Sequence, residues 1–409
     1  MTSDTHAFVW VWLPGATEPV VAGRLDQWGP IFGFVYGRSY LELPGAIPLY
    51  LPDLPLIEES ISPLGGAEAP GPILDAAPDA WGQRVIESWI LGRGSNEDLG
   101  LLTYLLESGS NRIGALDFTR SSSDYIARAA GSASLDDLLT AVELLDQGLP
   151  LPAGLGDALL HGSSIGGARP KALLDDGNRK LIAKFSSTSD TFSTVKAEFV
   201  AMELARRAGL DVAVVEHTTA LGKDMLLVER FDRTAGNGRR LMVSGTTMAG
   251  LDPRVAARYG SYAELADLVV SRFTDAEATL RELFSRIVFN ILISNTDDHL
   301  RNHSAFWDGR VLTLTPAYDL TPQTRSGGEA VQAMAIGRDG YRFSQLVGAV
   351  ERAAPYHLTE RDARDICDHQ IDVIRRDGDE VCDLAELTKT EREGLWGRQF
   401  LNPYATEGY

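Results

Sequence analysis

A short polar segment in the second half of the chain carries residues that could act on a phosphate ester. Residues 294–302 read SNTDDHLRN, and Asp297 and Asn302 lie five positions apart in it. A carboxylate can orient an attacking hydroxyl group and take its proton, while an oxygen ligand close by can hold a metal ion. Because one loop supplies both groups, the pattern indicates phosphoryl transfer, with Asp297 as the catalytic residue and Asn302 as a metal ligand.

The segment that follows supplies a second carboxylate. Residues 304–307 (SAFW), a turn at Asp308-Gly309 and residues 311–319 (VLTLTPAYD) predict a β-hairpin that returns Asp319 to the loop. Protein kinases have the same order: a catalytic Asp, an Asn five positions later, and a metal-binding Asp after a hairpin. We therefore expect Asn302 and Asp319 to hold Mg²⁺, a hard cation that prefers oxygen ligands. Each residue taken alone could instead be a turn or cap residue.

The first half contains groups that could hold a nucleotide. Residues 163–171 (SSIGGARPK) are rich in small side chains, which would expose backbone N–H groups to phosphates. Lys184 ends the next expected strand and could reach the α- and β-phosphates, with Glu198 on the following helix as its ion-pair partner. Glu229–Phe231 close the last strand of this region, where a hinge would hold adenine. Taken singly, the loop could be a flexible turn and the charged side chains could be solvated surface groups.

The N-terminal residues predict a small antiparallel sheet, because β-branched and aromatic runs alternate with Gly and Pro. The expected strands are residues 8–13, 20–25, 32–36 and 40–43. Residues 62–72, rich in Gly, Pro and Ala, predict a loop. Short helices are expected at residues 80–91, 97–106 and 136–148.

Residues 171–230 predict a second sheet with one helix inserted. The expected strands are residues 171–174, 180–185, 212–219 and 225–230, the first two joined by an Asp-Gly turn at 175–178. The helix spans 195–208 and is followed by Gly209, a residue type favoured after a helix C-terminus. Beyond Tyr262 apolar residues recur three and four positions apart, which predicts a mainly helical region. The clearest stripe comprises Leu280, Leu283, Phe284, Ile287, Val288 and Ile291.

These elements together predict an α+β chain with a two-lobed, protein-kinase-like fold. With 409 residues the chain is too long for one ordinary core. The expected domains are a β-rich N-terminal domain (1–105), a nucleotide-binding lobe with the Gly-rich loop (106–233), and a mainly helical C-terminal lobe with the catalytic and metal-binding loops (234–409).

The composition limits which partners the protein can bind and the cellular compartment in which it is expected. The chain has 38 Lys and Arg against 57 Asp and Glu, a formal net charge of −19, so its long-range field repels DNA and anionic membranes. Cys367 and Cys382 are the only cysteines, too few for a disulfide framework or a thiolate zinc site. The N-terminus has no basic, apolar leader. We expect a soluble, cytoplasmic protein that contacts DNA only through a partner.

Assembled in this order, the chain resembles the HipA family of bacterial toxin kinases over most of residues 162–319. The pieces that carry the resemblance are Ser164–Lys171, Ile182–Lys184, Glu198-Phe199, Ala208–Leu210, Val228–Arg233, Asn295–Asn302 and Leu314–Asp319. The N-terminal strands and Pro78–Gly82 are also similar to the domain that precedes the kinase core in this family.

The resemblance implies an ATP- and Mg²⁺-dependent serine/threonine protein kinase. Asp297 would be the catalytic acid/base, and Asn302 and Asp319 would hold Mg²⁺. Residues that would contact ATP are Gly166, Gly167, Ala168, Arg169, Pro170, Lys171, Lys184, Glu229, Arg230, Phe231, His299 and Tyr318. The family also phosphorylates a serine of its own Gly-rich loop; Ser164 matches that position, and Ser163 lies beside it. A phosphoserine there would repel the nucleotide.

The resemblance also implies partners. Members of this family usually have a small DNA-binding antitoxin, and some phosphorylate aminoacyl-tRNA synthetases. A protein substrate and an antitoxin partner are therefore expected. A non-catalytic binding module that acts through such a partner is the alternative to an enzyme.

The sequence can also be compared with motifs of other enzyme classes, and the context of each motif argues against that class. Residues 162–166 (GSSIG) fit the GxSxG elbow of serine hydrolases with Ser164 as nucleophile, but that elbow requires a preceding strand and a following helix, and here a hairpin is expected to follow. His299 and His303 have a zinc-like spacing, but the adjacent Glu of the metalloprotease motif is missing and Arg301 would repel the ion. No GxxxxGK[ST] occurs, which argues against a P-loop NTPase.

Overall fold

The chain folds into two compact units of mixed composition. The computed structural model describes residues 4–92, 98–128, 133–165, 167, 169–177, 179–186, 192–325 and 327–409. The first unit comprises Met1–Ser189, Thr218–Val243 and Phe306–Arg310, and the second comprises Asp190–His217, Ser244–Ala305 and Val311–Tyr409. The finer boundaries at residues 105 and 233 stay predictions.

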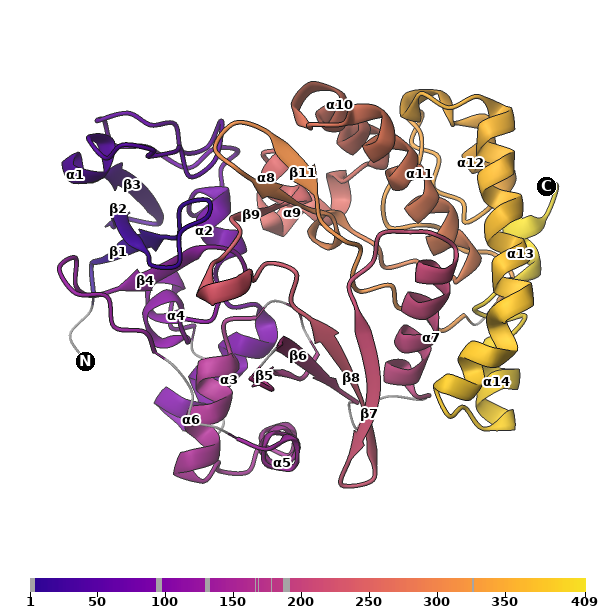
Figure 1. Cartoon of the computed structure of the whole chain (residues 1–409), viewed down its shortest axis with the longest axis horizontal. Coiled ribbons are helices and arrows are strands. Elements are labelled where there is room, and N and C mark those ends of the chain that lie inside the picture. Colours follow the sequence, from indigo (N-terminus) through magenta and orange to yellow (C-terminus); the bar gives the residue numbers. More distant parts are fainter. Residues whose placement is uncertain are drawn as a thin grey trace. The chain divides into compact units, whose positions relative to one another are not determined.

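The N-terminal sheet of the first unit has the strand order β3-β2-β1-β4 (Figure 1). Its strands are β1 (His6–Val11), β2 (Val20–Trp28), β3 (Ile31–Tyr36) and β4 (Leu116–Thr119), paired antiparallel. The strands predicted at residues 8–13, 20–25 and 32–36 are confirmed. β4 comes from a distant segment and is absent from the prediction.

The strand predicted at residues 40–43 is wrong, because this segment forms the short helix α1 (Arg38–Leu41). The helical turn stacks the Tyr40 ring on the Tyr36 ring, with centroids 5.6 Å apart. The Tyr40 hydroxyl donates to the Ile47 carbonyl at 2.9 Å. Packing and hydrogen bonding of one buried side chain thus outweigh the local β propensity.

The second sheet has the order β5-β6-β8-β7. Its strands are β5 (Lys171–Asp175), β6 (Lys180–Phe185), β7 (Val215–Ala220) and β8 (Lys223–Glu229). The predicted hairpin is confirmed by the antiparallel pairing of β5 with β6. In its turn, Gly177 takes a φ of 87° and its amide donates to the Asp175 carboxylate at 3.0 Å. The two later strands are confirmed with ends shifted by a few residues.

The helices of the first unit follow the sequence patterns closely. They are α2 (Gly71–Asp75), α3 (Ala80–Leu91), α4 (Leu101–Glu107), α5 (Leu135–Asp146) and α6 (Ala153–Gly162). The helices predicted at residues 80–91 and 136–148 are confirmed, as is most of 97–106, of which residue 97 lies outside the described residues. Ser134 and Asp137 cap α5 reciprocally, which fixes its start.

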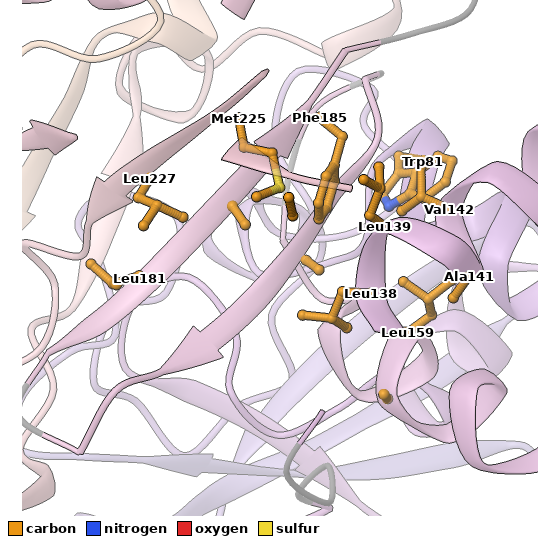
Figure 2. Close-up of a cluster of buried hydrophobic side chains, with 14 of the residues drawn as sticks. Trp81, Leu138, Leu139, Ala141, Val142, Leu159, Leu181, Phe185, Met225 and Leu227 are labelled. Atoms are coloured by element: carbon orange, nitrogen blue, oxygen red, sulfur yellow. The ribbon is translucent and has the colours of Figure 1, made fainter. Parts of the chain in front are cut away.

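An apolar core joins the second sheet to α3, α5 and α6 (Figure 2). Side chains from the helices and from β6 and β8 interdigitate in it, among them Trp81, Leu138, Leu139, Val142, Leu159, Leu181, Phe185, Met225 and Leu227. The Trp81 indole N–H is satisfied by the Lys171 carbonyl at 2.9 Å. This core fixes the sheet that carries the predicted nucleotide-binding residues.

The second unit is mainly helical, as predicted. Its helices are α7 (Thr194–Arg207), α8 (Gly245–Met248), α9 (Pro253–Tyr259), α10 (Tyr262–Arg272), α11 (Ala276–Leu292), α12 (Leu346–Glu351), α13 (Glu360–Leu384) and α14 (Lys389–Leu395). Helix α7 ends before Gly209, which has the expected φ of 85°. The whole apolar stripe predicted for α11 is buried, and α13 packs against both α7 and α11.

Short elements complete the chain. They are the strands β9 (Met242–Ser244), β10 (Ser304–Trp307) and β11 (Leu312–Leu314) and the 3-10 turns η1 (Ala235–Asn237), η2 (Leu300–Asn302), η3 (Ala354–Tyr356) and η4 (Pro403–Thr406). β10 and β11 form the hairpin predicted around Asp308-Gly309. Within the described ranges, no helix has the length and apolarity needed to cross a bilayer.

The core in Figure 2 gives a stability prediction. Replacing Phe185 by Ala removes a ring that is 1 % exposed and leaves a cavity, so we expect a loss of about 3–5 kcal/mol in the free energy of unfolding. Ile126 is 75 % exposed, and Ile126→Ala should change it by less than about 0.5 kcal/mol. Urea unfolding followed by circular dichroism measures both. Equal stabilities for the two variants would contradict the placement of this core.

Candidate active site

The loop that contains Asp297 follows directly after helix α11. Ser294 leaves the helix with a φ of 55°, and its hydroxyl donates to the Gln399 carbonyl at 2.7 Å. The Asn295 amide donates back to the Asn290 carbonyl at 2.8 Å. These bonds turn the chain out of the helix, and Asp297 lies on an exposed turn.

The next residue, Asp298, is the buried anchor of this loop. Its Oδ2 atom accepts hydrogen bonds from the Tyr262 hydroxyl, from Asn290 Nδ2 at 2.8 Å and from His303 Nε2 at 2.7 Å. Tyr262 begins α10, Asn290 lies near the end of α11, and His303 follows η2. One carboxylate therefore fixes the loop to three separate elements.

The charges around Asp298 explain its ionisation. Burial alone would raise the pKa of this carboxyl, but the nearby His303 and the hydrogen bonds from His303 and Tyr262 lower it below its usual range. Burial, followed by the Asp298 charge, holds the pKa of the Tyr262 hydroxyl well above its usual value. The pair is therefore an ionised carboxylate that accepts from a neutral phenol.

In contrast, several polar groups of the loop have no structural partner. Across the part of the chain that the structure describes, no hydrogen bond reaches the Asp297 carboxylate or the Asn302 side-chain amide, and the buried Nδ1 atom of His299 is also unpaired. Of these groups the His299 Nδ1 atom is buried, and buried polar groups in proteins are normally satisfied, whereas the Asp297 carboxylate is exposed to solvent. Groups left open beside a rigidly held carboxylate are candidates for binding a ligand.

The segment that carries Asp319 returns to this loop. The Tyr318 hydroxyl donates to the Arg301 carbonyl at 2.7 Å and lies 2.6 Å from the Ser304 hydroxyl. These contacts join the residue before Asp319 to the residue before Asn302. Asp319 itself is half-buried and has a φ of 61°, an uncommon conformation for a non-glycine residue that often marks functional positions.

Two further contacts hold the return segment in place. Ala317 exchanges backbone hydrogen bonds with the 211–213 segment, its amide donating to the Asp211 carbonyl at 2.7 Å. The buried guanidinium of Arg286, on α11, donates to the carbonyls of Thr315 at 2.9 Å and Asp211 at 3.2 Å. The same helix that leads into the catalytic loop therefore also positions the segment before Asp319.

This half of the site has the donor set of a hard divalent cation. Asp297, Asn302 and Asp319 offer two carboxylates and an amide oxygen on two segments joined by the Tyr318–Arg301 bond. Oxygen ligands of this kind suit Mg²⁺, so the residues present fit the ion. Among the described residues, no group of three or more His, Cys, Asp or Glu side chains forms a metal cluster, and the zinc-like spacing of His299 and His303 is not used for one.

The predicted Gly-rich loop joins helix α6 to strand β5. Ser163 caps the helix, and its hydroxyl donates to the Leu160 carbonyl at 2.5 Å. Ser164 is 2 % exposed, and its hydroxyl has no partner within the described ranges. Helix, turn and strand follow in that order, the reverse of the strand-turn-helix that a hydrolase elbow requires. Gly166 and Ala168 lie outside the described residues.

Two hydrogen bonds link the start of helix α3 to the backbone of this loop at Gly167. The Gly167 amide donates to the Asp79 carboxylate, and the Trp81 amide donates to the Gly167 carbonyl at 3.3 Å. A Cβ atom at Gly82 would lie 1.9 Å from the Ser163 carbonyl oxygen, so the helix reaches the turn only because this residue is glycine. The Pro78–Gly82 motif therefore supports the Gly-rich loop.

Lys171 and Lys184 lie opposite each other on β5 and β6. Directly opposed residues of an antiparallel pair point to the same face of the sheet. The Lys171 ammonium lies against Gly167, where a Cβ atom would be 2.0 Å from its Nζ. Arg169 is exposed and Pro170 is buried. Glu198 belongs to the other unit, so its pairing with Lys184 stays a prediction.

The segment predicted as the hinge is tied to the loop at residues 111–114. The buried Arg230 side chain pairs with Asp232 at 2.7 Å and donates to the Asn111 carbonyl at 2.8 Å. Asp232 also accepts from the Gly114 amide at 2.7 Å. The guanidinium of Arg230 is thereby held by structural partners, and the backbone N–H of this residue donates to the Lys180 carbonyl at 2.9 Å. Neither donor of Arg230 is therefore available to a nucleotide.

The hinge residues form a dense charged cluster. Burial opposes ionisation of Asp232, but Arg230 and Arg233 bring the pKa of its carboxyl far below the usual range. Burial lowers the pKa of the Arg233 guanidinium well below its ordinary value. The Phe231 ring is half-buried and lies 6.0 Å from the Phe306 ring in an edge-to-face contact.

Sequence analysis missed the residues that position the site. Asp298, Arg286 and Asn111 were not singled out, because their importance depends on partners that are distant in sequence. The only local signal was the adjacent pair Asp297-Asp298, in which the pattern does not tell which carboxylate is buried.

The comparison with protein families decides the membership of the chain. The family described as HipA-like C-terminal domain matches residues 163–377, more than half of the chain. The chain belongs to the HipA family. The matched region begins at the Gly-rich loop and includes the loop at residues 294–302 and the return segment.

Relatives and solved structures agree with this membership. A Sinorhizobium fredii protein named "Putative kinase Y4mE" is 29 % identical over 318 residues, which cover 72 % of this chain and 73 % of that protein. A second protein of that organism, "Putative kinase Y4dM", is 32 % identical over 136 residues, 30 % of this chain and 32 % of that one. Shewanella oneidensis HipA, solved with HipB and operator DNA, has a TM-score of 0.68 at 19 % identity over 95 % of this chain and 94 % of that one. The predicted α+β fold of the HipA type is confirmed.

The buried anchor gives a prediction on stability and pH. Asp298→Asn replaces an ionised acceptor of three hydrogen bonds, so we expect a loss of about 3 kcal/mol in the free energy of unfolding at pH 7. Because the pKa of Asp298 is lower in the folded chain, its contribution is present above the unfolded value of about 4 and is lost as the pH falls through the folded pKa. Chemical unfolding at several pH values measures this.

The adjacent carboxylate serves as the matched control for this anchor. Asp297→Asn, at an exposed position, should change the stability by less than about 0.5 kcal/mol at any pH. If both variants were equally stable, or if the difference between them grew as the pH fell, Asp298 would not be the ionised anchor.

Proposed function

We propose that this protein is an ATP- and Mg²⁺-dependent serine/threonine protein kinase of the HipA type. The observation that carries the proposal is the contact of Tyr318 with Arg301, which joins the Asp297–Asn302 loop to Asp319 within one unit. Membership of the HipA family and the relatives described as kinases support it. Among the described residues, the exposed Asp297 carboxylate and the Asn302 amide have no hydrogen-bond partner, so neither is committed to a structural contact.

Asp297 would orient the hydroxyl group of the acceptor residue and receive its proton. The acceptor oxygen forms a bond to the γ-phosphorus of ATP, the bond to the β–γ bridging oxygen breaks, and ADP leaves. The rigid hold on Asp298 keeps the neighbouring Asp297 at a fixed position, which lowers the entropy cost of aligning the hydroxyl.

Asn302 and Asp319 would hold Mg²⁺, which neutralises charge on the phosphates when bound. Lys171 and Lys184, opposed on β5 and β6, would bind the phosphates, and Gly167 would face them with its backbone. The backbone of Glu229–Phe231 would hold the adenine, while His299 and Tyr318 would lie beside the nucleotide. We further propose the Lys184–Glu198 ion pair that kinases use to align the phosphate-binding lysine.

The partners also follow as proposals. The HipA structure from Shewanella oneidensis contains HipB and operator DNA, which supports a small DNA-binding antitoxin as a partner of this chain. With a net charge of −19, the protein would contact DNA through that partner. The acceptor would be a cellular protein, with a component of translation as one candidate, and the reaction would take place in the cytoplasm.

Loss of the catalytic carboxylate tests the activity. Asp297→Asn should reduce transfer of labelled γ-phosphate from ATP to protein by about a hundredfold or more, because the acceptor hydroxyl loses its base. Removal of Mg²⁺ by chelation should abolish the transfer. Asp372→Asn, at an exposed position on α13, is the control and should retain full activity. Full transfer by the Asp297 variant would refute the catalytic assignment.

The position of the autophosphorylated serine gives a second test. Ser164 is proposed as the acceptor because its hydroxyl is unpaired within the described ranges, whereas that of Ser163 is bonded to Leu160. Ser164→Ala should abolish self-labelling of the Gly-rich loop, and Ser163→Ala should retain it. Mass spectrometry after incubation with ATP and Mg²⁺ locates the phosphate. A phosphate on Ser163 in the wild type would overturn this choice.

A further inference from the structure

A short two-stranded ribbon follows the segment that carries Asp319. Val331 and Phe343 pair antiparallel, and the Gln332 amide donates to the Arg342 carbonyl at 2.7 Å. Val331 is 54 % exposed and Phe343 is 48 % exposed, so this pairing lies on the surface of the second unit.

The ribbon lies next to the catalytic loop. The Ala333 amide donates to the carbonyl of Thr296 at 3.1 Å, and Thr296 directly precedes Asp297. Val331 is two residues from Ala333, about 7 Å along an extended chain. A peptide that presents its hydroxyl to Asp297 would therefore pass within reach of the ribbon.

One face of the ribbon is apolar and exposed. Val331 is 54 % exposed and Phe343 48 %, and their direct pairing places both side chains on the same face. On the other face Gln332 is buried and donates to the Ser344 hydroxyl at 3.0 Å. The buried face anchors the ribbon, and the exposed pair, called here the ribbon face, is left for a partner.

Two arginines beside the ribbon have no carboxylate partner among the residues that the structure describes. In that part of the chain, Arg342 donates to the backbone carbonyls of Ala333 and Arg258. Arg258, exposed near the end of α9, forms no ion pair with any described residue. Other arginines of the same region are neutralised by acids: Arg254 by Asp252, Arg338 by Asp267 and Arg352 by Asp339. Arg258 and Arg342 thus place two cationic groups beside the ribbon, while the same segment carries an exposed carboxylate, Glu329.

We propose that the ribbon face and Arg258 dock the acceptor protein, through a segment that carries an acidic side chain and an apolar side chain beside the phosphorylated residue. The inference rests on the proposed kinase function and adds the chemistry of its substrate. Apolar burial on Val331 and Phe343 supplies affinity, and the arginines select against basic segments. The net charge of −19 repels acidic segments from the rest of the surface, so an acidic substrate would bind only where the arginines offset that field.

A peptide library tests the docking. Wild-type protein, labelled ATP and Mg²⁺ are incubated with a positional-scanning library that has one central serine. We expect Asp or Glu, and Leu or Phe, at defined flanking positions to be preferred about tenfold over Lys and Gly. Arg258→Glu should move the charge preference from acidic to basic residues, and Phe343→Ala should remove the apolar preference while the acidic preference remains.

Two matched controls use exposed positions elsewhere in the same unit. Arg375→Glu on α13 reverses an exposed charge, and Val270→Ala on α10 trims a side chain that is 49 % exposed. Both should keep the wild-type selection. Thermal unfolding of every variant verifies that a changed selection does not reflect misfolding.

ATP hydrolysis measured without any peptide distinguishes failure of the docking proposal from failure of the kinase proposal. If Mg²⁺-dependent ATP turnover is present but no library peptide is phosphorylated, or if Arg258→Glu keeps the acidic preference, the docking proposal is overturned and the kinase proposal stands. Absence of Mg²⁺-dependent turnover would instead refute the kinase proposal and the docking proposal with it. A selection that follows the charge at Arg258 supports both.

Discussion

The Asp298 carboxylate, buried after α11 and bonded to Tyr262, Asn290 and His303, is the interaction on which the rest of the site depends. A buried carboxylate without partners would cost several kcal/mol, so the three donors and the carboxylate must stay together. The loop has no freedom to slide relative to α10 and α11. Asp297, the neighbour in sequence, therefore has a fixed backbone, while its side chain is exposed.

The return segment is held in place as firmly as the loop. Arg286 and the 211–213 backbone bind the chain before Asp319, and Tyr318 bonds to the carbonyl that precedes Asn302. Both segments are thus held by groups of α11 or by each other. A shift of α11 would move the two carboxylates and the amide together, which is the condition for a metal site of constant geometry.

Local patterns sufficed for much of the fold and for the first candidates of the site. The period of Leu280 to Ile291 identified α11, Gly209 marked the end of α7, and the spacing of Asp297 and Asn302 pointed to the loop. Tyr40 escaped prediction, because its ring packs on Tyr36 and overrides the local β propensity. Asp298 and Arg286 were not predicted for a related reason. Each acts through partners that come together only when the chain folds.

The central claim is that Asp297, Asn302 and Asp319 gather around one divalent cation at the phosphates of ATP. A crystal structure of the protein with Mg²⁺ and a non-hydrolysable ATP analogue tests it most directly. The account predicts an ion about 2.1 Å from an Asn302 oxygen and an Asp319 oxygen, with Asp297 facing the γ-phosphate. An ion bound by other side chains, or a nucleotide whose phosphates lie away from Lys171 and Lys184, would contradict it.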